Sequence, residues 1–370
     1  MKAIAAIISI FLCCNVASCS NIDEEINNLM QDAKVKGLAV VVVKDNKIVF
    51  CKSYGKKNDK ENLEENDLFR IASVSKTFVA TLIMQLVESG KVNLHDNVND
   101  YLNFKVQNPI YPEKIVTVEM LLSHRSSIND KKGYTSFSCL KEGKCYEKFP
   151  PGDAFCYSNM NYCLLAAIIE NVLSERFDNV VESRIISPLG LKASFNLKDV
   201  DSTLLVDTYY YNSETHEYRK CNNTYRAFVP DVPSYELGYS VTSLEPAGGL
   251  LISSYDLAKY MLVHMNNGAL EDGSRILKEE SEKEMRKVRT EGINYGLSFK
   301  KYPNVLKNKI LYGQTGGARG VSSAMIFDPE EKCGFVILCN GCFTVDRDGY
   351  STLHKPMVNL LYDKIVRCIQ

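Results

Sequence analysis

The stretch Arg70-Ile71-Ala72-Ser73-Val74-Ser75-Lys76-Thr77-Phe78 places a serine and a lysine three positions apart at the start of a predicted helix. The apolar residues among 79–87 fall on one helical face, and Ser89-Gly90 is typical of a helix end. A serine nucleophile needs a base within hydrogen-bond reach, which a lysine three positions further along the same face provides. The helix N-terminus also favours negative charge on the serine oxygen. The stretch therefore suggests Ser73 as a nucleophile and Lys76 as its base.

The S-x-x-K spacing alone is weak, because it recurs at Ser53-Lys56, Ser138-Lys141 and Ser298-Lys301. Only Ser73 lies between a strand-like segment and a strongly apolar helix. Ser73 could instead be an N-cap residue, because serine is preferred at that position of a helix. Further motifs in the chain are needed to distinguish a nucleophile from a cap.

Strand and helix signals divide the chain into three parts. Apolar, β-branched residues within 37–51, interrupted by a turn, predict a buried hairpin. Helical and irregular chain then dominates to about residue 240, after which strands return and a last amphipathic helix ends the protein. The two ends are therefore expected to share one sheet, with a mainly helical insertion between them. The predicted segments are strands at 37–43, 48–51, 249–252, 295–299, 310–312, 323–327 and 334–338, and helices at 75–89, 118–122, from about 161 to 173, and at 355–366.

Composition argues against several kinds of partner. The 370 residues carry 44 Lys and Arg against 45 Asp and Glu, with no basic stripe, so nucleic acid is not an expected partner. The five histidines lie far apart and show no zinc-ligand spacing, and we predict no metal and no cofactor. Thirteen cysteines are too few for a disulfide scaffold. Cys139 and Cys145 flank a short loop and could pair, but sequence does not supply the geometry that a disulfide needs.

The first residues have the pattern of an export signal. Met1-Lys2 precedes an uncharged apolar run at 3–14, too short to span a bilayer but suited to the core of a signal peptide. Val16-Ala17-Ser18-Cys19 resembles the bacterial lipobox, in which the cysteine is lipidated and becomes the new N-terminus. We expect residues 1–18 to be a lipoprotein signal peptide. Cys19 would then anchor the exported chain to the bacterial outer membrane, facing the periplasm or the surface, and this lipid is the one membrane contact expected. A plain secretory cleavage site is the alternative.

The stretch from Arg70 to Phe78 around Ser73 resembles the active-site segment of class C β-lactamases, related serine hydrolases and penicillin-binding proteins. That family carries a second motif, Tyr-x-Asn, preceded by Pro-Gly and followed by a helix. Tyr157-Ser158-Asn159 follows Pro151-Gly152 and precedes the helix predicted near residue 161, whereas the other Tyr-x-Asn triplets of this chain lack that context. The resemblance runs from about residue 37 to 362, and further similar stretches are 121–127, 246–250 and 295–297.

The resemblance implies an α/β (α+β) fold of the β-lactamase/transpeptidase type. In such a fold an antiparallel sheet, formed from both chain ends, is flanked by helices and carries an inserted helical lobe. For this chain we expect one catalytic domain at 19–370. Its sheet lobe would cover about 22–75 and 241–370, and its helical lobe about 76–240.

The third family motif is where this sequence departs. Family members place Lys-Thr-Gly or His-Thr-Gly on a strand that lines the site, whereas this chain has Gly313-Gln314-Thr315-Gly316-Gly317. In β-lactamases and D-Ala-D-Ala peptidases that cation helps to hold the substrate carboxylate. Arg319 is close enough in sequence to substitute for it, although an arginine in a glycine-rich loop is more often a solvated side chain. The implied substrate-binding residues are Asn159, Gln314, Thr315, Gly316, Gly317 and Arg319.

The resemblance implies acyl transfer through an acyl-enzyme on Ser73, with Lys76 and Tyr157 exchanging its proton. Asn159 would orient Lys76 and the substrate, and the N–H groups of Ser73 and Gly317 would hold the oxyanion. The expected substrate is a small molecule or short peptide with an amide or ester: a β-lactam, a D-amino-acid peptide or a carboxylic ester. An acyltransferase to an alcohol and a non-catalytic penicillin sensor remain alternatives, and a monomer is expected. The chain has no G-x-S-x-G elbow of an α/β-hydrolase.

Overall fold

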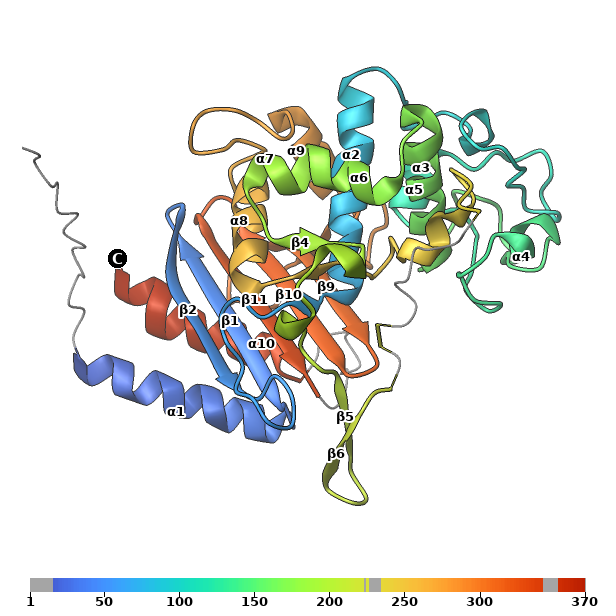
Figure 1. Ribbon diagram of the computed structural model, residues 1–370. Helices are drawn as coiled ribbons and strands as arrows, with labels where there is room; N and C mark the ends of the chain where they lie inside the picture. The colour runs from blue at the N-terminus through green and yellow to red at the C-terminus, as the bar shows by residue number, and fades with distance from the viewer. Residues whose placement is uncertain (1–15, 223, 226–233, 342–351, 370) are drawn as a thin grey trace, which may run out of the picture.

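A six-stranded antiparallel sheet joins the two ends of the chain (Figure 1). The strand order is β2-β1-β11-β10-β9-β8, so the N-terminal hairpin lies directly beside the last strand. This confirms the predicted sheet shared by both chain ends. The computed structural model describes residues 16–222, 224–225, 234–341 and 352–369. The strands are β1 Gly37–Lys44, β2 Lys47–Gly55, β8 Lys300–Tyr302, β9 Leu311–Ala318, β10 Val321–Asp328 and β11 Cys333–Asn340.

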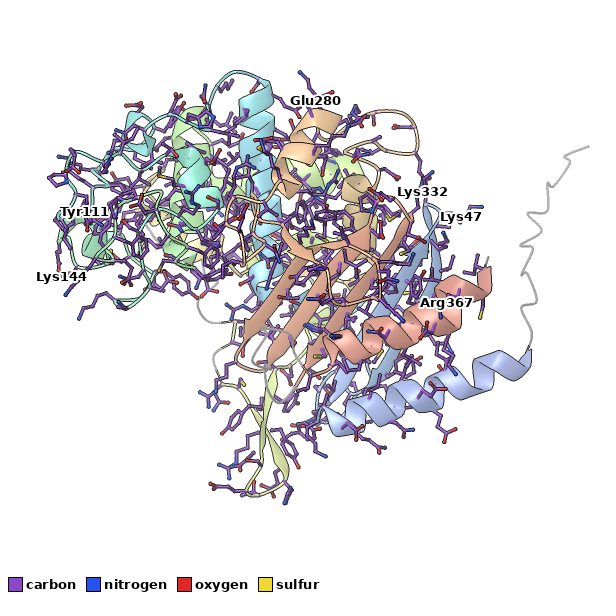
Figure 2. The ribbon with its side chains drawn as sticks, turned by 180° about the vertical axis from the view of Figure 1, so that it is seen from behind. Lys47, Tyr111, Lys144, Glu280, Lys332 and Arg367 are labelled. Atoms are coloured by element: carbon purple, nitrogen blue, oxygen red, sulfur yellow. The ribbon has the colours of Figure 1, made fainter. Side chains whose placement is uncertain are left out.

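Both faces of this sheet are buried, which explains why β1 carries no polar side chain before Lys44. Successive side chains of a strand point to opposite faces. Val40 and Val42 accordingly pack in the cluster that contains Ile26, while Val41 and Val43 pack in the cluster under the remaining helices. The first face is covered by α1 (Val16–Asp32) and α10 (His354–Leu361), which cross it in Figures 1 and 2.

The other face carries α8 (Ser254–Met265) and the helical part of the chain. In Figure 2, Tyr111 and Lys144 mark the far end of this part, opposite Arg367 near the C-terminus. Three short strands, β3 Phe69–Arg70, β7 Leu251–Ile252 and β4 Ala193–Ser194, form a second sheet. The remaining elements are α2 Lys76–Glu88, α3 Val118–Leu122, α4 Ser138–Lys141, α5 Asn159–Leu173, α6 Phe177–Val181, α7 Ser187–Leu189, α9 Glu279–Arg286 and the hairpin β5 Tyr209–Asn212 with β6 Glu217–Lys220.

The strand predicted at 295–299 is wrong. All five residues are buried, but the backbone turns sharply: Gly296 N donates to the Phe299 carbonyl at 2.7 Å, and Ser298 has a φ of +71°. Leu297 N donates to the Met285 carbonyl at 2.8 Å, so this loop is tied to the end of α9 rather than to a neighbouring strand. The buried residues at 295–299 thus belong to a tight loop and not to a strand.

The N-terminal predictions meet the structure only in part. Residues 1–15 of the predicted signal peptide lie outside the described residues, and α1 begins at Val16 and runs through Cys19. Among the described residues, no helix has both the length and the apolar character needed to cross a membrane.

Cys139 and Cys145 are both buried and free, so the disulfide left open by the sequence is not formed.

Candidate active site

Ser73 lies in a short turn that is fixed from two sides. The chain leaves β3, makes one 3₁₀ turn over Ala72–Ser75 and enters α2. Ile71 N donates to the Leu250 carbonyl at 3.1 Å, and Ser323 Oγ of β10 donates to the Ile71 carbonyl at 2.7 Å. Ala72 has a φ of +45°, which is uncommon and costly for a residue with a side chain. The surrounding hydrogen bonds therefore hold a strained backbone directly before Ser73.

The serine hydroxyl receives two hydrogen bonds from the predicted proton-exchanging groups. Lys76 Nζ lies 3.1 Å from Ser73 Oγ, and the Tyr157 hydroxyl lies 2.7 Å from it. Tyr157 is 39% exposed, whereas Lys76 is fully buried. The N-cap position of α2 is Ser75, not Ser73, and no side-chain cap bond is formed there. The capping alternative therefore has no support, and Ser73 faces the lysine and the tyrosine instead.

The lysine ammonium has all three of its N–H donors engaged. Besides Ser73 Oγ, it donates to Asn159 Oδ1 at 2.7 Å and to the Ala247 carbonyl at 2.6 Å. A buried charge of this kind is tolerated because each donor has an oxygen partner. Lys76 thus joins the serine turn, the start of α5 and the loop before β7.

Asp130, which the sequence analysis did not single out, holds the start of α5. Its carboxylate accepts the backbone N–H groups of Asn159 and Met160 at 2.7 and 3.2 Å, and the Ser158 hydroxyl at 2.7 Å. It also accepts Asn159 Nδ2 at 2.9 Å. Because Nδ2 faces Asp130, Oδ1 of the same amide must face Lys76. A negative charge at a helix N-terminus is itself favourable.

Strand β9 passes so close to the serine turn that only glycine fits at residue 316. A β-carbon there would lie 2.5 Å from the Ile71 carbonyl oxygen and 2.9 Å from the Ser73 nitrogen. Gly317, the next residue, is exposed, and a β-carbon on it would meet nothing within 4 Å. The backbone of 316–317 and that of Ser73 therefore form adjoining walls of the site, as an oxyanion pocket requires.

Gln314 belongs to the same strand, β9, and its side chain is buried. Its Nε2 donates to the Tyr295 hydroxyl at 2.7 Å and to the Ser298 carbonyl at 3.0 Å, which uses both donors of the amide. Its Oε1 accepts the Thr315 N–H at 3.1 Å. Burial raises the pKa of Tyr295, with Tyr162 and Tyr157 adding to the effect. Gln314 thus holds the protonated Tyr295 and the loop at 295–299, which was predicted to be a strand, in place by hydrogen bonds.

The remaining predicted residues lie further out. Thr315 is partly buried in β9. Arg319 is exposed in the turn after β9, with its guanidinium 4.7 Å from the centre of the Tyr210 ring. Cys19 belongs to α1, whose buried residues pack on the sheet face opposite to the one contacted by Ile71 and Val74. Among the described residues, no group of three or more His, Cys, Asp or Glu side chains could hold a metal ion.

Comparisons with known proteins agree with this geometry. The family model described as Beta-lactamase matches residues 22–353. The chain is 26% identical over 356 residues to Beta-lactamase-like protein 4 of Dictyostelium discoideum, covering 85% of this chain and 58% of that protein. It is 27% identical over 232 residues to Penicillin-binding protein 4 of Amycolatopsis lactamdurans, covering 60% and 57%. The chain thus spans less than two thirds of the length of these curated relatives.

A solved structure extends the likeness to three dimensions. The octameric penicillin-binding protein homologue from Pyrococcus abyssi superposes with a TM-score of 0.73 at 25% identity, covering 93% of this chain and 76% of that one.

Proposed function

The chain belongs to the beta-lactamase family, and from this premise we propose that it is a serine hydrolase that forms an acyl-enzyme on Ser73. The observation that carries the proposal is the position of one hydroxyl, Ser73 Oγ, within hydrogen-bond reach of both Lys76 Nζ and the Tyr157 hydroxyl. Substrates of the proposed class are amides and esters: β-lactams, D-amino-acid peptides and carboxylic esters.

The proposed reaction has two steps. Ser73 Oγ attacks the substrate carbonyl, its proton passes to Lys76 or Tyr157, and one of these groups protonates the leaving amine or alcohol. The N–H groups of Ser73 and Gly317 stabilise the oxyanion that forms on the carbonyl oxygen. In the second step water attacks the acyl-serine and gives a proton to Lys76 or Tyr157, which passes it on to Ser73 Oγ as the bond between this oxygen and the acyl carbon breaks. Free Ser73 and a carboxylic acid result.

The expected acyl-enzyme can be trapped and counted. Mature protein is incubated with a serine-directed fluorophosphonate probe and, separately, with penicillin, and its intact mass is followed alongside turnover of a nitrophenyl ester. We expect one adduct on Ser73 and ester turnover, both abolished in Ser73→Ala. Ser138→Ala is a matched control, because Ser138 belongs to another S-x-x-K pair and its hydroxyl contacts Ser136.

Each result has one interpretation. An adduct with no turnover would replace the hydrolase by a penicillin-sensor function, and product formation only with an added alcohol would replace it by an acyltransferase. Turnover that survives in Ser73→Ala would refute the assignment of the nucleophile.

We also propose that Cys19 carries a lipid that anchors the exported protein. Cleavage before Cys19 would leave the part of α1 that packs on the sheet through Ile22, Ile26 and Met30. In a bacterial host, labelled palmitate should enter the wild-type protein and not Cys19→Ala. Equal labelling of the two would contradict the proposal.

A further inference from the structure

His124 contacts every residue of the segment 156–158, which carries Tyr157. Its carbonyl oxygen accepts the Cys156 N–H at 2.8 Å, and its ring Nδ1 accepts the Ser158 N–H at 3.2 Å. Between these two bonds, the imidazole lies against the Tyr157 ring with the centroids 4.1 Å apart and the planes inclined by 32°. The backbone φ of +57° at His124 lets its carbonyl and its ring face the same segment. The imidazole is fully buried.

The hydrogen bonds around the ring determine its tautomer. Nδ1 also faces Asn161 Nδ2 at 3.2 Å, and Asn161 Oδ1 accepts the Ser126 hydroxyl at 2.7 Å, which fixes the orientation of that amide. Both neighbours of Nδ1 are therefore N–H donors, so Nδ1 carries the lone pair and the ring proton is on Nε2. Within the described part of the chain, Nε2 is buried without a hydrogen-bond partner.

The surroundings keep this ring uncharged. Burial, and next to it the charge of Lys76, hold the pKa of His124 well below its ordinary value. The other titratable side chains that face the ring are Tyr157, Tyr162 and Tyr295, with ring centroids 4.1, 5.2 and 5.1 Å away. Burial raises the pKa of both Tyr162 and Tyr295, so these two remain neutral as well. No carboxylate contacts the imidazole among the described residues to stabilise a second ring proton.

We propose that His124 is the positioning residue for Tyr157: its neutral, Nε2-protonated ring supports the phenol and fixes it over Ser73 Oγ, without exchanging a proton itself. The inference rests on the proposed function, because it concerns the same acyl transfer. Tyr157 is partly exposed, its hydroxyl lies 2.7 Å from Ser73 Oγ, and the imidazole packs against its ring. Without the imidazole, the phenol should be free to move away from the serine. A misplacement of a reacting group by about 1 Å can cost ~10²-fold in rate.

The test replaces the ring and keeps the acceptor. In His124→Asn, the amide oxygen can still accept the Ser158 N–H, and asparagine tolerates a positive φ better than most residues. The matched control is His216→Asn, the same change at an exposed residue with a φ of +55° in the turn between β5 and β6. For nitrophenyl ester hydrolysis we expect His124→Asn to lower kcat by about 10- to 100-fold with KM within about twofold. His216→Asn should match the wild type.

The outcomes separate a positioning role from a structural one. A kcat equal to that of the wild type, in a folded His124→Asn protein, would overturn the proposal, as would a loss confined to KM. Nitrogen-15 NMR of the labelled wild-type protein tests the tautomer without any variant, with the ring assigned by its contacts to Tyr157. We expect a proton on Nε2 alone at and around neutral pH. A proton on Nδ1, or titration near neutral pH, would overturn the proposal.

Failure here is distinguishable from failure of the proposed function. If the wild type forms no adduct on Ser73, the hydrolase proposal fails, while the NMR experiment still reports on His124. If Ser73→Ala is inactive and His124→Asn is fully active, the hydrolase proposal stands and the positioning role is lost.

Discussion

Replacing Gly316 by alanine should inactivate the protein at modest cost to its stability. The new β-carbon would clash with Ser323 Oγ, and it would lie 2.5 Å from the Ile71 carbonyl oxygen and 2.9 Å from the Ser73 nitrogen. Two of these atoms belong to the backbone, so β9 has to move away from the serine turn. Overpacking of this kind costs about 1–3 kcal/mol of stability. Displacing one oxyanion donor, here the Gly317 N–H, typically costs about 10²- to 10³-fold in kcat.

The assay compares kcat/KM for a nitrophenyl ester with the midpoint of thermal unfolding. Gly90→Ala is the control for stability, because Gly90 follows α2, has a φ of +69° and would place its β-carbon in open space. Alanine there strains the backbone by about 1 kcal/mol, some 20 Å along the helix from Lys76. For Gly90→Ala we expect a lower melting temperature than that of the wild type and an unchanged kcat/KM. Wild-type activity in Gly316→Ala, or an equal loss in Gly90→Ala, would refute the reasoning.

Two further predictions concern residues that support the site. Asp130 Oδ2 accepts both hydrogen bonds from Asn159, and Oδ1 accepts those from the Ser158 hydroxyl and the Met160 N–H. Asp130→Asn leaves one acceptor oxygen for these four donors, so the start of α5 and with it the Asn159 amide should be held less firmly toward Lys76; ester hydrolysis should show kcat lower by about tenfold or more, and an unchanged kcat would contradict this role. The depressed pKa of His124 makes stability depend on pH, because below its ordinary value of 6.5 the unfolded ring binds a proton and the folded ring does not. The free energy of unfolding should therefore fall as pH drops below 6.5, by up to about 1.4 kcal/mol per pH unit until the folded pKa is reached. Urea titrations should give a shallower dependence for His124→Asn, and identical dependences would show that the ring titrates normally when folded.

Local signals in the sequence were enough for the central strands of the sheet and for the serine turn. β1 is buried on both faces, and its residues from 37 to 43 carry no polar side chain. Such a run is typical of a central strand or a buried helix. Ser73 and Lys76 are three residues apart, and their contact follows from one helical turn. At 295–299, where the chain folds back on itself, the apolar residues gave no information about strand pairing, because a tight loop against α9 buries them as well.

The supporting residues of the site could not be found in this way. Asp130 is 29 residues from Asn159 in the chain, and His124 is 34 residues from Ser158. Ala247 contributes only a carbonyl oxygen, which any residue has, from 171 positions away. Such contacts depend on how loops cross in the folded protein, and no spacing rule describes them. His124 lay within a stretch that resembled the family, but its role became visible only once its Nδ1 neighbours were known.

The three contacts of Lys76 also indicate how it could act as a base. The Ala247 carbonyl and Asn159 Oδ1 can only accept hydrogen bonds, and they are the two shorter partners, at 2.6 and 2.7 Å. A neutral amine keeps two N–H donors and gains one lone pair. If the two donors stay on the two obligate acceptors, the lone pair is directed at the third partner, Ser73 Oγ at 3.1 Å, which is the one partner with a proton to give. The Asp130 contact that fixes Asn159 Oδ1 therefore helps to aim the lone pair at the serine.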